Sequence, residues 1–168
     1  METVKSFIKK GAGFTLLEVL FAVVLVGMVI AALAASSGAF TLYNAAGLDL
    51  STAEFLVEEV REMTAPLPVA DPVSGTASFG IEAGEVTLAL YDDVDDFNNR
   101  TINPPVDADR NPMPEFSSYT QRIDVDNVNP ADLTQTASPH TTDFYRITVT
   151  ITKNGQLVTS SSWIRARY

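Results

Sequence analysis

The sequence has no cysteine among its 168 residues, and His140 is its only histidine. The missing thiols exclude disulfides, thiol nucleophiles and thiolate metal sites, although they do not fix the compartment. His140 lies in a predicted loop, residues 138–142, where a lone histidine is expected at the surface and not in catalysis. Ser160, Ser161 and Ser162 lack the glycine pattern of a nucleophile elbow, and no phosphate-binding glycine loop occurs. We therefore expect a protein that is not an enzyme.

Basic residues are also scarce. Eleven lysines and arginines stand against 21 aspartates and glutamates, which gives a formal net charge of −10. Residues 1–13 carry Lys5, Lys9 and Lys10 against Glu2, a net charge of +2, whereas the remaining 155 residues carry −12. An acidic bulk repels nucleic acid, and no stripe of lysine or arginine suggests a phosphate track. No nucleic-acid partner is expected.

Proline is absent from residues 1–65, and residues 14–35 hold only two polar side chains, Thr15 and Glu18. As a helix this stretch is about 33 Å long, enough to cross a hydrocarbon core of about 30 Å. Because the lysines precede it, the basic end should stay in the cytoplasm and the acidic bulk should cross the membrane.

Two ordinary explanations of this stretch are incomplete. A secretory signal has an apolar region of about 7–15 residues. Residues 14–35 exceed that length, although the alanines before Ser36 imitate a cleavage site and would give a soluble protein that starts near Ser36. A plain membrane anchor explains the length but not Glu18, since a carboxylate inside a spanning helix costs about 2.5–3.5 kcal/mol. Glu18 could alternatively lie close enough to the membrane interface to stay hydrated.

The segment Gly13-Phe14-Thr15-Leu16-Leu17-Glu18-Val19, which follows a basic leader, closely resembles the prepilin processing motif of type IV pilins and type II secretion pseudopilins. The resemblance implies that a prepilin peptidase cleaves between Gly13 and Phe14 on the cytoplasmic side. It also implies N-methylation of the new amino terminus on Phe14, and assembly with other pilin subunits on a pilus or secretion platform.

The spacing within this motif has a chemical reason. Cleavage leaves a positive amine on Phe14, and Glu18 lies four residues later on the same helix face. In a filament core the Glu18 carboxylate could meet the amine of a neighbouring subunit instead. Removing one partner of such a buried pair typically costs about 3–5 kcal/mol. We therefore expect Glu18 to set the axial register of the subunits.

Helical patterning continues beyond the membrane, as far as the prolines at 66 and 68. We expect four segments: a basic leader at 1–13, a transmembrane and filament-core helix at 14–35, its continuation at 36–64 and a periplasmic β-rich domain at 65–168. The family resemblance implies that the long helix and the domain form a lollipop.

The domain is predicted to be a four-stranded antiparallel sheet on the second half of the helix, and the fold class is α+β. Residues 84–91 and 119–128 alternate as half-buried strands, with a long loop at 92–117 between them. Asn154-Gly155 predicts a type I′ hairpin turn. The register that follows from this turn places Ile151 opposite Val158, Tyr145 opposite Ile164 and Arg146 opposite Trp163.

The loop at 92–117 is rich in oxygen ligands of the kind that Ca²⁺ uses. The candidate ligands are Asp92, Asp93, Asp95, Asp96, Asp107, Asp109 and Asn111. The sequence departs from the EF-hand pattern, because Pro112 stands where that loop needs glycine. The alternative is a solvated acidic loop paired with Arg100 or Arg110. Acid–base work by Asp92 and Asp96 is discounted, because a polar loop should keep their pKa values ordinary. No other cofactor is predicted.

The run from Tyr91 to Phe97, YDDVDDF, also resembles a segment of minor pilins similar to the D subunit of mannose-sensitive hemagglutinin pilus systems. The expected function is therefore a minor pilin or pseudopilin of a type IV pilus or type II secretion-like filament. The expected location is the bacterial inner membrane, with a single pass and a cytoplasmic N-terminus, and then a periplasmic or cell-surface filament. The alternative is a permanently anchored periplasmic binding module that depends on calcium.

Overall fold

The computed structural model describes residues 13–73, 75 and 78–167, and it divides into two compact units, one ending at Ala45 and the other beginning at Ala46. One long helix is followed by short 3-10 turns and an antiparallel sheet, as predicted for the α+β class. In chain order the elements are α1 (Leu16–Thr64), η1 (Leu88–Leu90), η2 (Asp95–Phe97), β1 (Arg100–Ile102), η3 (Pro114–Phe116), β2 (Tyr119–Asn129), β3 (Asp132–Thr136), β4 (Phe144–Lys153) and β5 (Gln156–Ala166).

Helix α1 runs unbroken through 49 residues, within two residues of the predicted start and at the predicted end. Gly38 and Gly47 do not interrupt it. Its most apolar 18-residue window has a mean hydropathy of 2.8, so by length and composition the helix is able to cross a membrane. None of that window is buried. The first buried residue is Ala53, and from there one face of the helix packs on the sheet.

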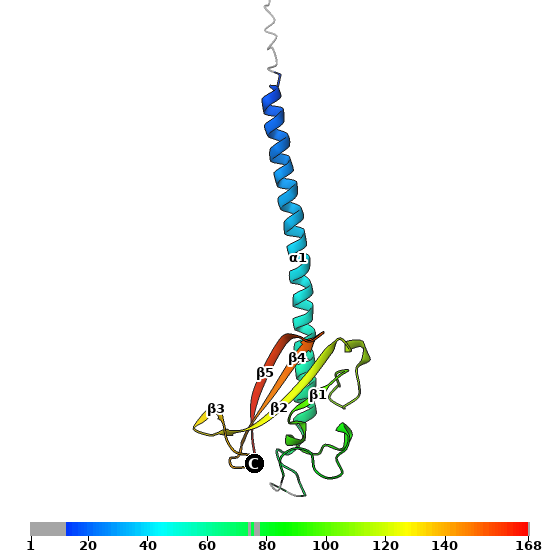
Figure 1. Ribbon diagram of the computed structural model, residues 1–168, viewed down its shortest axis with the longest axis vertical. Coiled ribbons are helices and arrows are strands. Elements are labelled where there is room, and N and C mark those ends of the chain that lie inside the picture. The colour runs from blue at the N-terminus through cyan, green and yellow to red at the C-terminus, as the bar shows by residue number, and fades with distance from the viewer. Residues whose placement is uncertain (1–12, 74, 76–77, 168) are drawn as a thin grey trace, which may run out of the picture. The chain divides into compact units, whose positions relative to one another are not determined.

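The sheet has five strands rather than four, in the order β1-β2-β4-β5, with β3 paired to β2 off this path. Figure 1 shows the four main strands side by side along the last turns of α1, and β3 projecting to one side. Strand β2 bears out the alternation predicted for 119–128. The additional strand β1 arises inside the stretch predicted to be a loop, where Arg100–Ile102 pair with Gln121–Ile123 of β2.

The hairpin of β4 and β5 forms at the predicted turn, with positive φ at Asn154 and Gly155. The predicted register holds for only two pairs, Lys153 with Gln156 and Thr152 with Leu157. It then shifts by one residue, so that Ile151 faces Thr159, Tyr145 faces Arg165 and Arg146 faces Ile164. The predicted pairs beyond the turn were therefore wrong, because a β-bulge adds a residue to β5 at Val158.

The shift reverses the faces of β5. A one-residue slip moves every side chain to the other side of a strand. Trp163 now lies on the helix side, where the Arg61 guanidinium stacks 4.7 Å from its ring centre. The predicted Arg146–Trp163 contact is replaced by an Arg146–Asp126 ion pair at 2.8 Å. Thr159 likewise reaches the helix and donates to Glu54 at 2.9 Å.

The hydrophobic core lies between the second half of α1 and the sheet, and it closes around one buried amide. Its fully covered apolar side chains include Ala53, Leu56, Val57 and Val60 from the helix, and Ile123, Tyr145, Ile147, Val149 and Ile151 from the strands. Gln121 is fully buried among them. Its amide donates to the carbonyls of Leu56 and Val106, both at 3.1 Å, and accepts from the Val106 N–H at 2.9 Å. One side chain thus joins the sheet, the helix and the loop.

The alternating stretch at 84–91 is not a strand. Val86 is 84% exposed and Leu90 is 50% exposed, so the predicted inward face has nothing to pack on. The stretch ends instead in the 3-10 turn η1, where the Leu90 N–H donates to the Thr87 carbonyl at 2.9 Å. The Leu88 carbonyl accepts from Arg110 at 2.9 Å, which fixes the turn without a neighbouring strand.

Candidate assembly and cation-binding sites

The start of α1 is closed by a reciprocal pair of side chains. The Glu18 carboxylate accepts from the N–H and the hydroxyl of Thr15, both at 2.9 Å, and the Thr15 hydroxyl accepts from the Glu18 N–H at 3.2 Å. This is a capping box, in which a threonine N-cap and a glutamate three residues later satisfy the free N–H groups of the first turn. The sequence prediction missed it, although Thr-x-x-Glu before an apolar run is its signature.

The capping box leaves part of the Glu18 carboxylate free. All three hydrogen bonds use Oε2 or the backbone, so Oε1 accepts no hydrogen bond from the described residues. Phe14 lies just before the helix and is 86% exposed. The predicted cleavage point between Gly13 and Phe14 therefore sits at the open end of α1, and leader residues 1–12 lie outside the described part of the chain.

Six carboxylates meet in the segment between α1 and the sheet. They form four triads, in each of which three carboxylate oxygens lie within 4.8 Å of one another. We name the whole set the acidic cluster: Asp71, Glu82, Glu85, Asp92, Asp93 and Asp96. Each residue belongs to two triads, and three pairs never share one: Asp71 and Asp96, Glu82 and Asp92, Glu85 and Asp93. Neighbouring triads thus share one residue.

In the acidic cluster, Asp93 and Asp96 each accept backbone hydrogen bonds at one carboxylate oxygen and, from the described residues, none at the other. Asp93 Oδ1 accepts from the N–H groups of Asp95 and Asp96 at 2.8 and 3.1 Å, and Asp96 Oδ2 accepts from the Asp92 N–H at 3.1 Å. The second oxygens have no hydrogen-bond donor among the described residues, although each atom is buried: Glu82 Oε2, Asp92 Oδ1, Asp93 Oδ2 and Asp96 Oδ1. Asp93 and Asp96 are both 0% exposed.

Burial dominates the electrostatics of this cluster. It raises the pKa of Asp93 to about 8, with the charge of Asp95 adding to the effect. Burial also raises the pKa of Asp96, against the hydrogen bond that the carboxyl accepts from the Asp93 N–H. A charged carboxylate loses hydration in such a place and is repelled by its neighbours. The expectation of an ordinary pKa for Asp96 in a polar loop was therefore wrong.

Asp95 belongs to none of the four triads, and its carboxylate contacts His140. Its Oδ2 lies 3.5 Å from His140 Nε2, and burial raises the pKa of Asp95 to about 7. The other ring nitrogen of His140 lies 2.9 Å from the Tyr145 hydroxyl, and the Phe79 ring packs edge-on at 5.1 Å. The His140 side chain is only 7% exposed, so the prediction of a surface histidine was wrong. Its contacts join the loop to β4.

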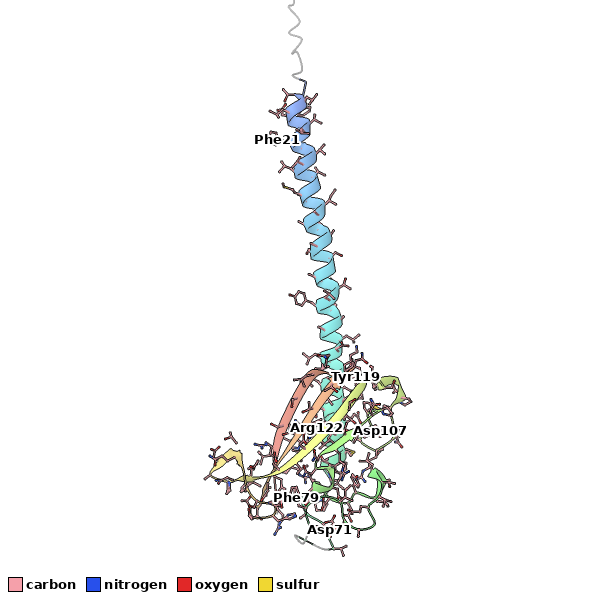
Figure 2. The ribbon with its side chains drawn as sticks, viewed as in Figure 1. Phe21, Asp71, Phe79, Asp107, Tyr119 and Arg122 are labelled. Carbon is pink, nitrogen blue, oxygen red and sulfur yellow. The ribbon has the colours of Figure 1, made fainter. Side chains whose placement is uncertain are left out.

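The remaining predicted ligands form a separate turn. Asp107 accepts from the backbone and the side-chain amide of Asn111 at 2.8 and 3.1 Å, and these bonds hold the pKa of Asp107 below its usual range. Figure 2 shows Asp107 beside the sheet. Asp71 lies elsewhere, near Phe79, at the end of the domain away from Tyr119. Among the described residues, neither Asp107 nor Asp109 belongs to a carboxylate triad.

The arginines of the loop bind carbonyl groups. Arg110 donates to the carbonyls of Leu88 and Tyr91 at 2.9 and 2.8 Å, and Arg100 donates to the Asp96 carbonyl at 3.3 Å. The ion pairs of the described residues include neither arginine. The predicted neutralisation of the acidic loop by Arg100 or Arg110 is therefore replaced by anchoring of its backbone.

The fold and the helix start together define a class, an α+β protein with a pilin-like arrangement, anchored in a membrane by an apolar helix. A family model described as the prokaryotic N-terminal methylation motif matches residues 8–34. The match supports a type IV pilin-like role, with processing by prepilin peptidase and assembly with other pilins, and it points to a structural subunit. Comparison with curated proteins and with solved structures gave no match.

Proposed function

We propose that this protein is a minor pilin or pseudopilin, stored in the bacterial inner membrane and built into a type IV pilus or a type II secretion-like filament. It crosses the membrane once, with residues 14–35 in the bilayer and the N-terminus in the cytoplasm. Prepilin peptidase cleaves between Gly13 and Phe14, and Phe14 becomes the methylated first residue. The relationship to the D subunit of mannose-sensitive hemagglutinin pilus systems is part of this proposal.

The observation that carries the proposal is the placement of the motif. The segment Gly13 to Glu18 stands where an exposed apolar helix begins, and the methylation motif matches across it. No residue of α1 before Ala53 is buried, so the apolar first part of the helix needs membrane lipid or other helices around it. Glu18 keeps one oxygen for an outside partner, and the Phe14 amine of a neighbouring subunit supplies the opposite charge.

The test is the chemical nature of the mature N-terminus. The full chain is expressed in a host that assembles type IV pili, and the N-terminal peptide is measured by mass spectrometry. We expect a start at Phe14 carrying one extra methyl group. The same host without its prepilin peptidase is the control, and it should yield only the uncleaved chain. An intact Met1 in the complete host would favour the permanently anchored module, and a start near Ser36 would indicate a secreted protein.

A further inference from the structure

The acidic cluster joins parts of the chain that have little regular structure of their own. Its members span residues 71–96, and the described part of that span contains only two 3-10 turns, η1 and η2. Asp71 lies soon after the end of α1, whereas Asp96 lies next to Phe97, which is fully buried in the core. A ligand held by all six carboxylates would therefore fasten this segment to the domain at several points.

Among the described residues, no ion pair supplies a positive charge to Glu82, Asp92, Asp93 or Asp96. Four buried oxygens of the acidic cluster have no donor, and neither loop arginine is ion-paired within the described residues. Burying carboxylates without a counter-charge is strongly unfavourable, so such groups take up protons or bind a metal ion. Each proton serves only one or two oxygens, whereas one cation can serve six to eight.

From this arrangement we propose that the acidic cluster binds a Ca²⁺ ion through one oxygen of each of its six carboxylates. All six ligands are hard oxygen donors, which suit Ca²⁺. Zn²⁺ is bound mainly by nitrogen and sulfur ligands, so this ligand set does not favour it. Around Ca²⁺ adjacent oxygens of an octahedral shell lie about 3.4 Å apart, and around Mg²⁺ about 2.9 Å. The oxygens of each triad lie within 4.8 Å of one another, a bound that both shells satisfy. The all-carboxylate ligand set favours Ca²⁺, because Mg²⁺ usually keeps several waters and one or two carboxylates.

The proposed site differs from the one expected from the sequence. It keeps Asp92, Asp93 and Asp96, and it replaces the downstream ligands with Asp71, Glu82 and Glu85. Asp95 is not a ligand, because it is directed to His140. The ion would fix the segment after α1 on the outer side of the membrane, where millimolar Ca²⁺ suits the weak sites of extracellular modules.

The experiment uses the full chain, purified in detergent micelles and freed of metal with EGTA. We expect about 10 mM CaCl2 to raise the Tm by roughly 5–10 °C, as mass action predicts for a ligand at 100 times its Kd. Asp93→Asn combined with Asp96→Asn should abolish the rise. Asp107→Asn combined with Asp109→Asn, which alters the neighbouring acidic turn, should leave it unchanged.

The outcomes separate the possibilities. No Ca²⁺-dependent rise in the unaltered chain, or an equal rise in the Asp93/Asp96 variant, would overturn the site. An equal rise with MgCl2 would overturn the assignment to Ca²⁺. Glu82→Gln, a half-buried loop position, repeats the test should the double variant fail to fold. Because no step requires cleavage or assembly, these results are independent of the proposed pilin function.

Discussion

At the scale of single residues, Glu18 has two roles that one substitution can separate: capping the helix and the proposed pairing with a neighbouring subunit. In the isolated chain it closes the first turn of α1 with Thr15. In a filament its charge would meet the amine of the next subunit. Capping needs only an acceptor at the third helical position, which glutamine also supplies, whereas pairing with an amine needs the negative charge.

Glu18→Gln therefore tests the charge with the cap retained. We expect normal cleavage but at least a tenfold loss of incorporation into sheared filaments, measured by immunoblot, because the amine of the neighbouring subunit loses its negative partner. Thr15→Val is the matched control, since it removes the capping hydroxyl and keeps the charge, and it should assemble nearly normally. Equal incorporation of Glu18→Gln and the unaltered protein would show that Glu18 acts only as a cap.

Asp49 provides a pH-dependent contact between α1 and the sheet. It accepts from Lys153 at 2.6 Å and from the Tyr119 hydroxyl at 2.8 Å, and these bonds lower the pKa of Asp49 from its ordinary value. A lowered pKa in the folded state means that the contribution to stability is complete above about pH 4, the ordinary value of an aspartate. It is lost as the pH falls through the folded-state pKa.

Asp49→Asn should flatten the acid side of the stability profile. We expect Tm measured between about pH 6 and pH 2 to fall less steeply for this variant than for the unaltered chain, with a lower Tm at neutral pH. Glu62→Gln, at an exposed position on the same helix, is the control and should keep the full slope. A parallel fall for Asp49→Asn would mean that the contact contributes no pH dependence.

At the scale of elements, local sequence patterns predicted the helix, the hairpin turn and strand β2, which depend mainly on residues close to one another in the chain. Asn154-Gly155 set the hairpin turn, and the alternation of residues 119–128 gave β2. The bulge at Val158 could not be predicted from the sequence, because both registers alternate equally well. The observed register depends on contacts of Thr159 and Trp163 with the helix, which is distant in the chain. Residues 84–91 alternate between apolar and polar side chains, as a half-buried strand would. They form no strand, because none of the described strands lies beside them to pair with.

Gln121 is the point where three elements depend on one side chain. Gln121→Leu should destabilise the chain by about 2–4 kcal/mol, because the buried carbonyl and N–H groups of Val106 and the carbonyl of Leu56 lose their partner. Urea unfolding in detergent measures the change. Ile123→Val, a nearby buried position, should cost only about 1 kcal/mol. Equal losses for the two variants would show that the amide network adds nothing beyond packing.

At the scale of the whole molecule, all buried apolar residues of the described chain lie between Ala53 and Ile151. The core therefore lies entirely within the unit that begins at Ala46. A fragment of residues 46–168 should be monomeric without detergent and should unfold cooperatively, with a Tm within about 5 °C of the full chain. Light scattering and circular dichroism check this, and an unfolded fragment would contradict it.

The two candidate sites differ in how far they could be predicted from the sequence. Gly13, Phe14 and Glu18 are close in the chain, so their motif could be predicted without a fold. The acidic cluster draws on residues from Asp71 to Asp96, and its loop geometry decides which carboxylates turn inward. Asp107 and Asp109 have the same chemistry as the cluster residues, and only the folded chain assigns them elsewhere.

The extra residue at Val158 is a bulge in an edge strand of the sheet. β5 lies at one end of the strand order β1-β2-β4-β5, so among the described strands its outer edge is free to pair with a neighbouring molecule. Loss of the one codon for Val158 would remove the bulge but leave Ile151 facing Thr159 and Ile147 facing Trp163, so Trp163 would stay on the helix side of the sheet. A lineage carrying this gene could thus lose or regain the bulge, and the local bend that it gives to this edge, in one mutational event that keeps the same residues of β5 towards the helix.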